Sequence, residues 1–346
     1  MRFIGNKTQL LDNIKEVVDK HALEAHSFCD IFSGTASVAR FFKQWYEVYS
    51  NDLLYFSYCL QRATIENPCK PAFELLSQAL GINDPISYFN EMSTECMESL
   101  PGEKRFFQNN YAPTGGRMYI TDSNALRIDF ARNTIEDWNH ASLLSPDEYY
   151  YLVACIVEGI PFVSNIAGTY GAFNKIWDAR SNKLFVLIDL PIVNNGLKNR
   201  SYNEEGTMLL QRISGDILYI DPPYNERQFL PNYHVLETAA KYDFPTLRGV
   251  TGQRPYEMLR SDFCSKKTVV SAFDSLLENA RFQHIILSYN TDGIMTLDEI
   301  EATMKKHGLP ATFEVNFIPY RRFKSKSIVT RTEELKEMLV YIQKEV

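Results

Sequence analysis

The segment Asp221-Pro222-Pro223-Tyr224 brings together a carboxylate, a backbone carbonyl of restricted geometry and an aromatic ring. Residues 215–220 before it alternate and are mostly apolar, which predicts a buried parallel strand. Two prolines remove two backbone donors and fix φ, so the chain must leave the sheet at Asp221. In open α/β sheets, ligands bind at this carboxyl edge. A plain strand followed by a proline-rich turn would have the same sequence, so the rest of the chain has to decide between the two interpretations.

A second candidate site precedes this segment in the chain. Residues 27–32 and 47–52 predict two buried strands, joined by a loop of small residues (33–37) and a helix. Such a unit binds nucleoside-like ligands, because small residues let the backbone approach and a terminal acid, here Asp52, accepts hydrogen bonds from ribose hydroxyls. The loop has the single glycine Gly34 and no G-x-G-x-x-G spacing, which favours a ligand without a pyrophosphate. An ordinary βαβ unit without a ligand is the alternative.

The composition is that of an ordinary globular protein, with 45% hydrophobic and 23% charged residues among 346. This length allows two domains, or one large domain with an insertion. The net charge of −7 argues against nonspecific coating of nucleic acid but permits a local basic groove. The six cysteines have no metal-ligand spacing, so we expect reduced thiols, no metal and a cytoplasmic protein. No apolar run is long enough to span a membrane.

Between residues 57 and 175 the pattern changes from strands to helices. A helical block inserted into an α/β chain predicts a separate recognition domain, residues 57–175, while residues 1–56 and 176–346 form the sheet domain. The expected fold is therefore α/β, with a Rossmann-like sheet and a mainly helical insertion.

Caps and apolar runs predict further elements outside the two candidate sites. Residues 145–148 and 296–299 have the order expected at the start of a helix, with a capping hydroxyl followed three residues later by Glu. Residues 284–290, 311–318 and 337–343 have the composition of strands.

Two segments could contact bases or phosphates. Residues 163–175 form a small, polar and aromatic loop, which could equally be a glycine-rich linker. Residues 321–326 contain four bases and no acid, which suits a phosphate clamp or a solvated loop. The candidate DNA contacts are Tyr170, Asn174, Lys175, Arg321, Arg322 and Lys324.

The two candidate sites share one sheet edge, and their chemistry is complementary. S-adenosylmethionine fits the first site because it has an adenosine, a charged sulfonium and no phosphate. An exocyclic amine of adenine or cytosine fits the second, because its delocalised lone pair requires two acceptors on the N–H groups. The carboxylate of Asp221 and the carbonyl of Pro222 supply these acceptors. Tyr224 can stack on a base taken out of its helix, with a gain of about 1–3 kcal/mol.

With these motifs the chain resembles the DNA adenine-N6 methyltransferases in which cofactor loop, S-adenosylmethionine motif, recognition domain and catalytic motif follow in that order. Residues 30–34 are similar to the family's D-x-F-x-G motif, and residues 221–224 to its catalytic tetrad, in which a first-position Asp is typical of adenine specificity. The resemblance implies that Phe3, Lys7, Asp30, Phe32, Gly34, Asp52 and Asp221 contact the cofactor, and that Asp221, Pro222 and Tyr224 are catalytic.

Three positions are less clear than the motifs around them. Thr35-Ala36 stands where the family often has a second glycine, and the acid of the intervening motif is either replaced by Asn203 or supplied by Glu204. From the residues alone, Lys7 after a glycine-containing loop would be a surface lysine.

The resemblance implies a site-specific adenine methyltransferase acting on double-stranded DNA, in a restriction-modification system with a cognate restriction endonuclease as possible partner. A second hypothesis is an RNA adenine or protein-glutamine methyltransferase with the same chemistry. A third is a catalytically silent DNA-binding homologue or specificity subunit. The helical insertion favours DNA, since sequence readout requires surface beyond the sheet, and the intact tetrad argues against a silent protein.

Overall fold

A computed structural model describes residues 5–319 and 336–345 of the chain. The strands in it are β1 (Ser27–Asp30), β2 (Glu47–Asn51), β3 (Arg200–Tyr202), β4 (Ser214–Ile220), β5 (Arg281–Asn290), β6 (Glu314–Pro319) and β7 (Lys336–Gln343). They form one seven-stranded sheet in the order β3-β2-β1-β4-β5-β7-β6. The first five of these are parallel, whereas β7 runs antiparallel to both of its neighbours. The predicted α/β class with a Rossmann-like methyltransferase sheet is confirmed.

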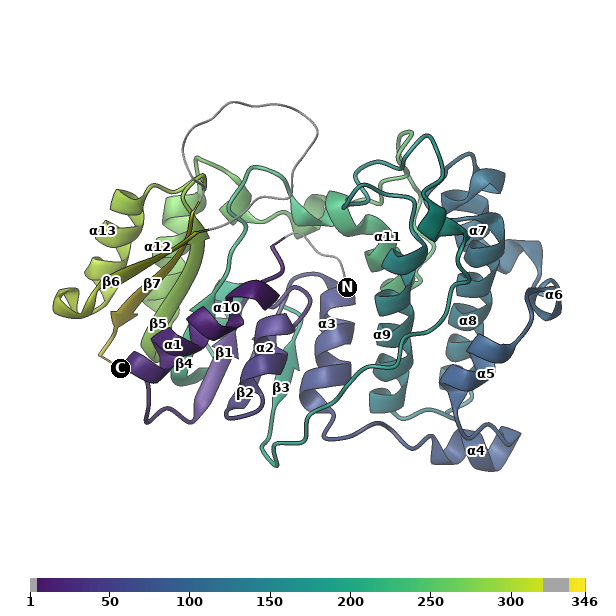
Figure 1. Ribbon diagram of the computed structural model, residues 1–346, viewed down its shortest axis with the longest axis horizontal. Helices are drawn as coiled ribbons and strands as arrows, with labels where there is room; N and C mark the ends of the chain where they lie inside the picture. The colour runs from purple at the N-terminus through teal and green to yellow at the C-terminus, as the bar shows by residue number, and fades with distance from the viewer. Residues whose placement is uncertain (1–4, 320–335, 346) are drawn as a thin grey trace.

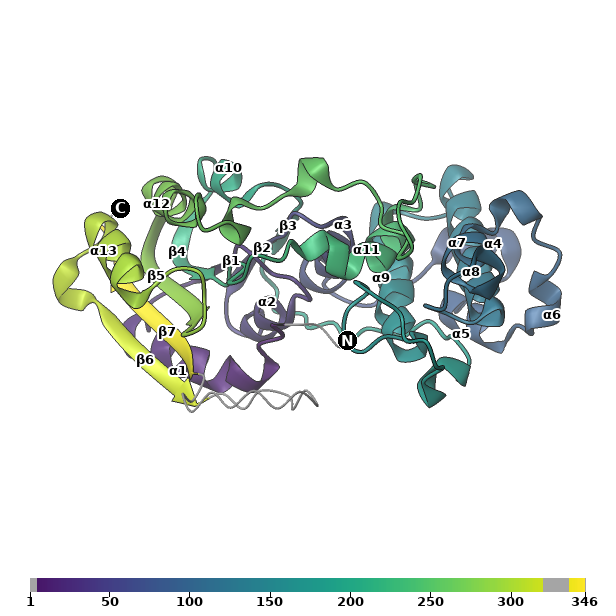
Figure 2. The same cartoon turned by 90° about the horizontal axis from the view of Figure 1, so that it is seen from above.

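Helices cover both faces of this sheet. The helices of the described residues, on the sheet and beside it, are α1 (Leu11–His21), α2 (Ser37–Phe42), α3 (Tyr55–Gln61), α4 (Glu74–Leu80), α5 (Pro85–Glu91), α6 (Thr94–Met97), α7 (Phe106–Tyr111), α8 (Asp122–His140), α9 (Pro146–Val163), α10 (Gly206–Leu210), α11 (Phe229–Lys241), α12 (Val269–Asn279) and α13 (Leu297–His307). Buried side chains of α1 and α2 pack on one face, and those of α10, α12 and α13 on the other. Figure 2 shows these two groups on opposite sides of the strands.

Local sequence signals account for where several elements begin and end. The capping boxes predicted at Ser145 and Thr296 are present, with Glu148 and Glu299 returning the hydrogen bond to the cap backbone. The residues of β4 from Ile217 to Ile220 are all buried, as expected of an interior parallel strand. These signals account for the starts of α9 and α13 and for the burial of β4 up to Ile220, directly before the turn at Asp221.

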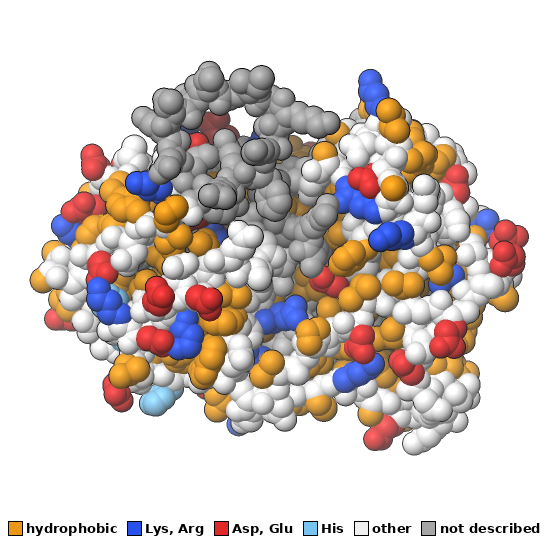
Figure 3. Space-filling model, in the orientation of Figure 1, with side chains coloured by type: hydrophobic (Ala, Val, Ile, Leu, Met, Phe, Trp, Pro, Cys, Tyr) orange, Lys and Arg blue, Asp and Glu red, His pale blue; other side chains and the backbone are white. Residues whose placement is uncertain are grey.

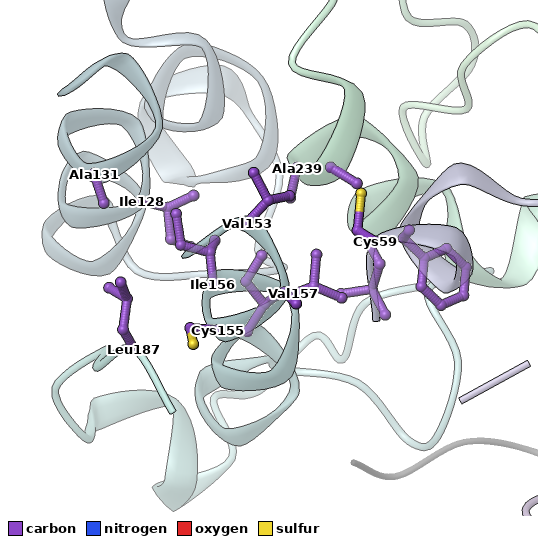
Figure 4. Close-up of a cluster of buried hydrophobic side chains, with 14 of the residues drawn as sticks. Cys59, Ile128, Ala131, Val153, Cys155, Ile156, Val157, Leu187 and Ala239 are labelled. Atoms are coloured by element: carbon purple, nitrogen blue, oxygen red, sulfur yellow. The ribbon is translucent and has the colours of Figure 1, made fainter. Parts of the chain in front are cut away.

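A second, mainly helical part lies beside the sheet, on the right in Figure 1. Its core is built on α9, whose residues are apolar nearly all round and therefore buried. Figure 4 shows Val153 and Ile156 of α9 between Ile128 of α8 on one side and Cys59 of α3 and Ala239 of α11 on the other. The helices between residues 57 and 175 therefore contribute to a core that is separate from those on the two faces of the sheet.

The boundary expected at residue 175 does not follow the packing. Phe185 and Leu187, which lie beyond it, belong to the helical core, as does α11, which follows β4 in the chain. The segment around Val186 crosses α9 at Gly159, where a side chain would overlap the Val186 carbonyl oxygen. The core of the helical part is thus assembled from two separate stretches of the chain, residues 54–190 and 230–242, which a composition change at one point could not reveal. In residues 5–319 and 336–345, no helix is both long and apolar enough to cross a membrane.

Candidate active site

The carboxyl ends of three parallel strands bring the predicted acids together. Asp30 ends β1, Asp52 directly follows β2 and Asp221 directly follows β4. Because β1 pairs with both β2 and β4, these ends lie side by side at one edge of the sheet. A cavity of about 420 Å³ opens there, and all three acids line it. This volume lies within the range of about 300–1,000 Å³ that small-ligand sites occupy.

Asp52 connects the second strand to the loop after the first. Its Oδ2 accepts the backbone N–H of Gly34 at 2.8 Å, and its Oδ1 accepts that of Leu54 at 2.8 Å. Burial raises the pKa of Asp52 to about 6, although these two backbone hydrogen bonds oppose the rise. Gly34 has a φ of 52°, in the region that glycine adopts without strain, so the loop can turn tightly against the acid.

The conformation of Ala36 shows how this loop is formed without the second glycine that the family often has there. It has a φ of 58° and lies at the N-cap of α2, completely buried. A left-handed conformation costs an alanine about 1–2 kcal/mol, which a glycine would avoid. The chain therefore keeps the backbone turn that a second glycine would allow, at a small cost in strain.

Asp30 is buried more deeply than the other two acids. Its side chain is 1% exposed, and its Oδ2 accepts the N–H of Ala39 at 3.2 Å. Within the described part of the chain, Oδ1 has no hydrogen-bond partner. Burial raises the pKa of Asp30 to about 8. Phe32, two residues on, lines the cavity with its ring edge-on to Phe263, at a centroid distance of 5.1 Å.

The predicted tetrad turns away from the sheet at the mouth of the same cavity. Asp221 keeps 16% of its side chain exposed, whereas Pro222 and Pro223 are buried. The ring of Tyr224 stands edge-on to Tyr289, with ring centroids 6.4 Å apart. All four residues of the tetrad line the cavity, so a carboxylate, a fixed carbonyl and an aromatic ring meet at one place.

Lys7 is buried in this site, and the expectation of a surface lysine is wrong. Its side chain is 3% exposed, and its Nζ lies 3.3 Å from Oδ1 of Asp221 and 3.2 Å from Oε2 of Glu337. Burial lowers the pKa of Lys7, but Asp221 and Glu337 outweigh it, so that the pKa lies above its usual value. For Asp221, burial raises the pKa, Lys7 opposes the rise and Glu337 adds to it, which leaves it at about 6.

Sequence reasoning missed Glu337. The antiparallel pairing of β7 with β5 sets Glu337 opposite Asn290, the last residue of β5, and so brings the start of β7 to the carboxyl edge. The one available signal was an acid at the head of an apolar strand, 337–343. The direction of that strand could not be inferred from its sequence.

The loop residues expected to contact DNA have different environments. Tyr170 is 1% exposed, its hydroxyl is 2.9 Å from that of Ser164, and its carbonyl accepts the Tyr119 hydroxyl at 2.8 Å. Its side chain is therefore part of the core, which corrects the expectation that it contacts DNA. Asn174 is half-buried and bonded to Asn165, whereas Lys175 is exposed. None of these loop residues lines the cavity.

Of the remaining predicted residues, some lie outside the described part of the chain and two are described. Phe3, Arg321, Arg322 and Lys324 lie outside the described residues. Of the two candidates for the intervening motif, Asn203 donates to the carbonyl of Asp52 at 2.8 Å, whereas Glu204 lines the cavity.

The charges around the cavity test which ligand it suits. The lining residues with acidic side chains are Asp30, Asp52, Glu204, Glu205, Asp221 and Asp262, and those with basic side chains are Lys7 and Arg260. An excess of acceptors and negative charge disfavours a pyrophosphate and favours a ligand with hydroxyls, amines and a positive charge. S-adenosylmethionine has these groups, so the residues present fit it. Within the described residues, no group of three or more His, Cys, Asp or Glu could hold a metal ion.

A mainly parallel sheet with an acidic cavity of about 420 Å³ beside an Asp-Pro-Pro-Tyr turn defines a methyltransferase of the Rossmann-like class. Comparison with known proteins gives the family: residues 3–303 match the model of the D12 class N6 adenine-specific DNA methyltransferases, and the chain belongs to this family.

Several curated proteins are similar to the whole chain. It is 47% identical to the Type II methyltransferase M.FokI of Planomicrobium okeanokoites over 100% of this chain and 53% of that protein. It is 42% identical to the Modification methylase StsI of Streptococcus sanguinis, over 99% of this chain and 52% of that protein. With the Type II methyltransferase M.NlaIII of Neisseria lactamica the identity is 34%, over 99% and 98% of the two chains. The chain thus spans about half the length of the first two relatives and nearly all of the third.

Proposed function

We propose that this protein transfers a methyl group from S-adenosylmethionine to N6 of an adenine flipped out of duplex DNA, at a specific site, without a metal. The observation that carries this proposal is the meeting of the Asp221–Tyr224 turn with the Asp52 loop in one acidic cavity. Membership of an adenine-specific DNA methyltransferase family supports the choice of base and of substrate.

The cavity residues divide into those that would hold the cofactor and those that would hold the base. Asp52 has free lone pairs for the ribose hydroxyls, and Asp30, Phe32 and the backbone at Gly34 form the adjoining wall. When bound, S-adenosylmethionine would supply a methyl carbon made electrophilic by the sulfonium charge. The excess of carboxylates in the lining favours that cation electrostatically.

At the tetrad, Asp221 and the Pro222 carbonyl would accept the two N–H groups of the adenine amine. Hydrogen bonds to both N–H groups would increase the electron density at N6, so that its lone pair could form the new N–C bond while the bond between the methyl carbon and sulfur breaks and its electron pair stays on sulfur. The amine becomes acidic only as this bond forms, so its surplus proton leaves toward the Asp221 carboxylate after transfer. Tyr224 would stack on the flipped base and fix its plane, since stacking contributes about 1–3 kcal/mol per base.

The helical part would supply the surface that reads the DNA sequence. On the face shown in Figure 3, Lys and Arg side chains are interspersed with Asp, Glu and apolar side chains, so no single sign of charge covers it. Phosphate contacts would then be local, and we assign them to Lys175 and Asn174 and to the run Arg321, Arg322 and Lys324.

A role in a restriction-modification system, with a cognate restriction endonuclease, is supported by the relatives' names, two of which are Type II methyltransferases and one a modification methylase. In such a system the methyl mark would protect the host's own copies of the site in the cytoplasm. The prediction is that DNA methylated by this protein resists one endonuclease of matching specificity.

The decisive test offers tritiated S-adenosylmethionine together with duplex DNA, RNA or protein, followed by nucleoside analysis. We expect label in N6-methyladenine of DNA. Label in RNA or in glutamine would support the second hypothesis, and DNA binding without transfer would support a silent homologue. Sequencing the methylated bases of DNA from cells that express the protein would then give the recognition site.

A further inference from the structure

The buried cluster at the end of β4 contains one cation and two carboxylates. The Nζ of Lys7 lies between Oδ1 of Asp221 and Oε2 of Glu337, at 3.3 and 3.2 Å. Lys7 and Glu337 are 3% and 4% exposed, so water screens them poorly, while Asp221 opens toward the cavity with 16% exposed. Glu337 therefore acts on the cavity through Lys7 and does not line it.

The charge of this cluster depends on Glu337. Lys7 and Asp221 alone would form a neutral ion pair, in which the ammonium group would cancel the field of the carboxylate at the amine. With Glu337 ionised as well, one positive and two negative groups leave one net negative charge. Opposite charges within about 4 Å interact strongly where solvent is excluded, so the carboxylate of Glu337 has a large effect on the charge of the cluster.

Other titratable groups face Asp221 from the neighbouring elements. Asp30 approaches from β1 and interacts with it, and burial raises the pKa of Asp30 to about 8, so most of its population is neutral at pH 7. Tyr219 from β4 is completely buried with a pKa well above its usual value, and therefore stays neutral. Lys7 and Glu337 are thus the two side chains that act most strongly on the charge of Asp221.

We infer that Glu337 is a positioning residue for methyl transfer: it shares Lys7 with Asp221 and so keeps the carboxyl edge of β4 negatively charged where the adenine amine becomes cationic. The inference rests on the proposed function. A carboxylate that is already in place lowers the energy of a developing positive charge without reorganisation, which is the most effective form of electrostatic stabilisation. A neutral Lys7–Asp221 pair would accept the same hydrogen bonds from the amine but would lack the net negative charge that stabilises its developing positive charge.

The same sheet offers a matched control. Glu314 on β6 pairs with Lys20 at 2.7 Å, as Glu337 pairs with Lys7, but its side chain is 28% exposed and, unlike Lys7, its partner Lys20 does not line the cavity. Glu314→Gln and Glu337→Gln therefore make the same chemical change in two lysine ion pairs of one sheet. They differ in distance from the candidate active site.

The first measurement needs no cofactor. Carboxyl-carbon NMR of aspartate-labelled protein, with the Asp221 signal assigned by its loss in Asp221→Asn, follows the ionisation of Asp221 directly. Burial, opposed by Lys7 and increased by Glu337, sets the pKa of Asp221 at about 6. We expect the midpoint to fall to roughly 5 in Glu337→Gln and to stay near 6 in Glu314→Gln.

The second measurement is the single-turnover rate of methyl transfer with saturating DNA and S-adenosylmethionine. At saturating S-adenosylmethionine, Glu337→Gln should lose roughly tenfold in rate, and Glu337→Asp should recover most of the loss. An unchanged midpoint, an unchanged rate, or a Glu337→Asp variant as slow as Glu337→Gln would overturn the inference. If Glu337→Gln does not fold, the midpoint and rate of Glu337→Asp decide, with near-normal values in support and a tenfold loss against. Failure of the proposed function would appear separately, as absence of transfer to DNA in the unaltered protein.

Discussion

Oδ2 of Asp52 accepts the N–H of Gly34 at 2.8 Å, so the acid that follows β2 holds the tight loop that follows β1. A second hydrogen bond, from the N–H of Leu54 to Oδ1, fixes the carboxylate from the other side. The orientation of Asp52 is therefore set before any ligand binds. Preorganisation of this kind keeps the entropic cost of binding low.

Asp52→Ala should weaken S-adenosylmethionine binding by about 1–3 kcal/mol, because the ribose hydroxyls lose a charged acceptor and two backbone donors lose theirs. Isothermal titration calorimetry would measure the dissociation constant without reference to activity. Asp12→Ala, on the exposed side of α1, serves as the control. Equal affinity in Asp52→Ala and the unaltered protein would remove Asp52 from the cofactor site.

Asp221→Ala should abolish methyl transfer while leaving cofactor binding measurable. It removes one of the two acceptors for the amine, for which losses of roughly 10²–10³-fold are typical, and also the group that receives the surplus proton, so that no transfer should be detected. Lys7 keeps Glu337 as a partner at 3.2 Å, so the variant should still fold. Single-turnover rates together with cofactor affinity would check this, and turnover like that of the unaltered protein would refute the assigned role.

The rate should fall in acid. Burial raises the pKa of Asp221 to about 6, and the ionised form is the one that accepts the amine N–H groups, so activity is present above pH 6 and is lost as the pH falls through 6. The pKa of Asp52 is also raised by burial to about 6, so cofactor affinity should decline over the same range. Measuring kcat with saturating cofactor separates the two effects. A rate that is constant from pH 8 down to pH 5 would contradict the role of Asp221.

Lys175→Ala should weaken DNA binding and flatten its dependence on salt. Each phosphate contact that is lost lowers the slope of log Kd against log salt by about 1. Lys198 is a matched exposed lysine, but it precedes β3 and so lies at the amino end of the strands, away from the cavity. Equal slopes for Lys175→Ala and Lys198→Ala would assign Lys175 to ordinary surface.

Gly159→Ala should destabilise the helical part by about 1–3 kcal/mol, because the added methyl would overlap the Val186 carbonyl oxygen and press on the ring of Phe185. Urea denaturation would measure the change in the free energy of unfolding. Gly102→Ala is the control, since a methyl there would meet no atom within 4 Å. Similar stability for both variants would show that the segment around Val186 can move away from α9.

Much of the fold could be predicted because its signals are local. The apolar run before Asp221 and the caps at Ser145 and Thr296 each specify their own element, and the structure confirms all three. The extent of the helical part was not predictable in this way. Phe185 and α11 enter its core through contacts between distant segments, which leave no pattern in the sequence near them.

In the candidate site, too, the residues specified by local signals were predicted, and those that depend on contacts between distant segments were not. Asp30, Asp52 and Asp221 were predicted to meet because each ends a parallel strand, and a parallel sheet aligns such ends. The positions of Lys7 and Glu337 depend on tertiary contacts. The residues next to each of them in the sequence indicate neither that it is buried nor which residue it pairs with. Tyr170 shows the opposite error: a loop rich in glycine and polar residues suggested an accessible ring, whereas the ring is packed into the core.

The position of β7 has a consequence for synthesis of the protein. β7 lies between β5 and β6 in the sheet but follows both in the chain, so these two strands are not neighbours until β7 has been inserted between them. A nascent chain that emerges in order therefore exposes an unpaired edge of β5, and Lys7 lacks its second carboxylate, until residues 336–343 have left the ribosome. Pairing of β7 then completes the sheet and the charged cluster in the same step, so a nascent chain without residues 336–343 would hold the Asp-Pro-Pro-Tyr turn without the electrostatic setting inferred for it.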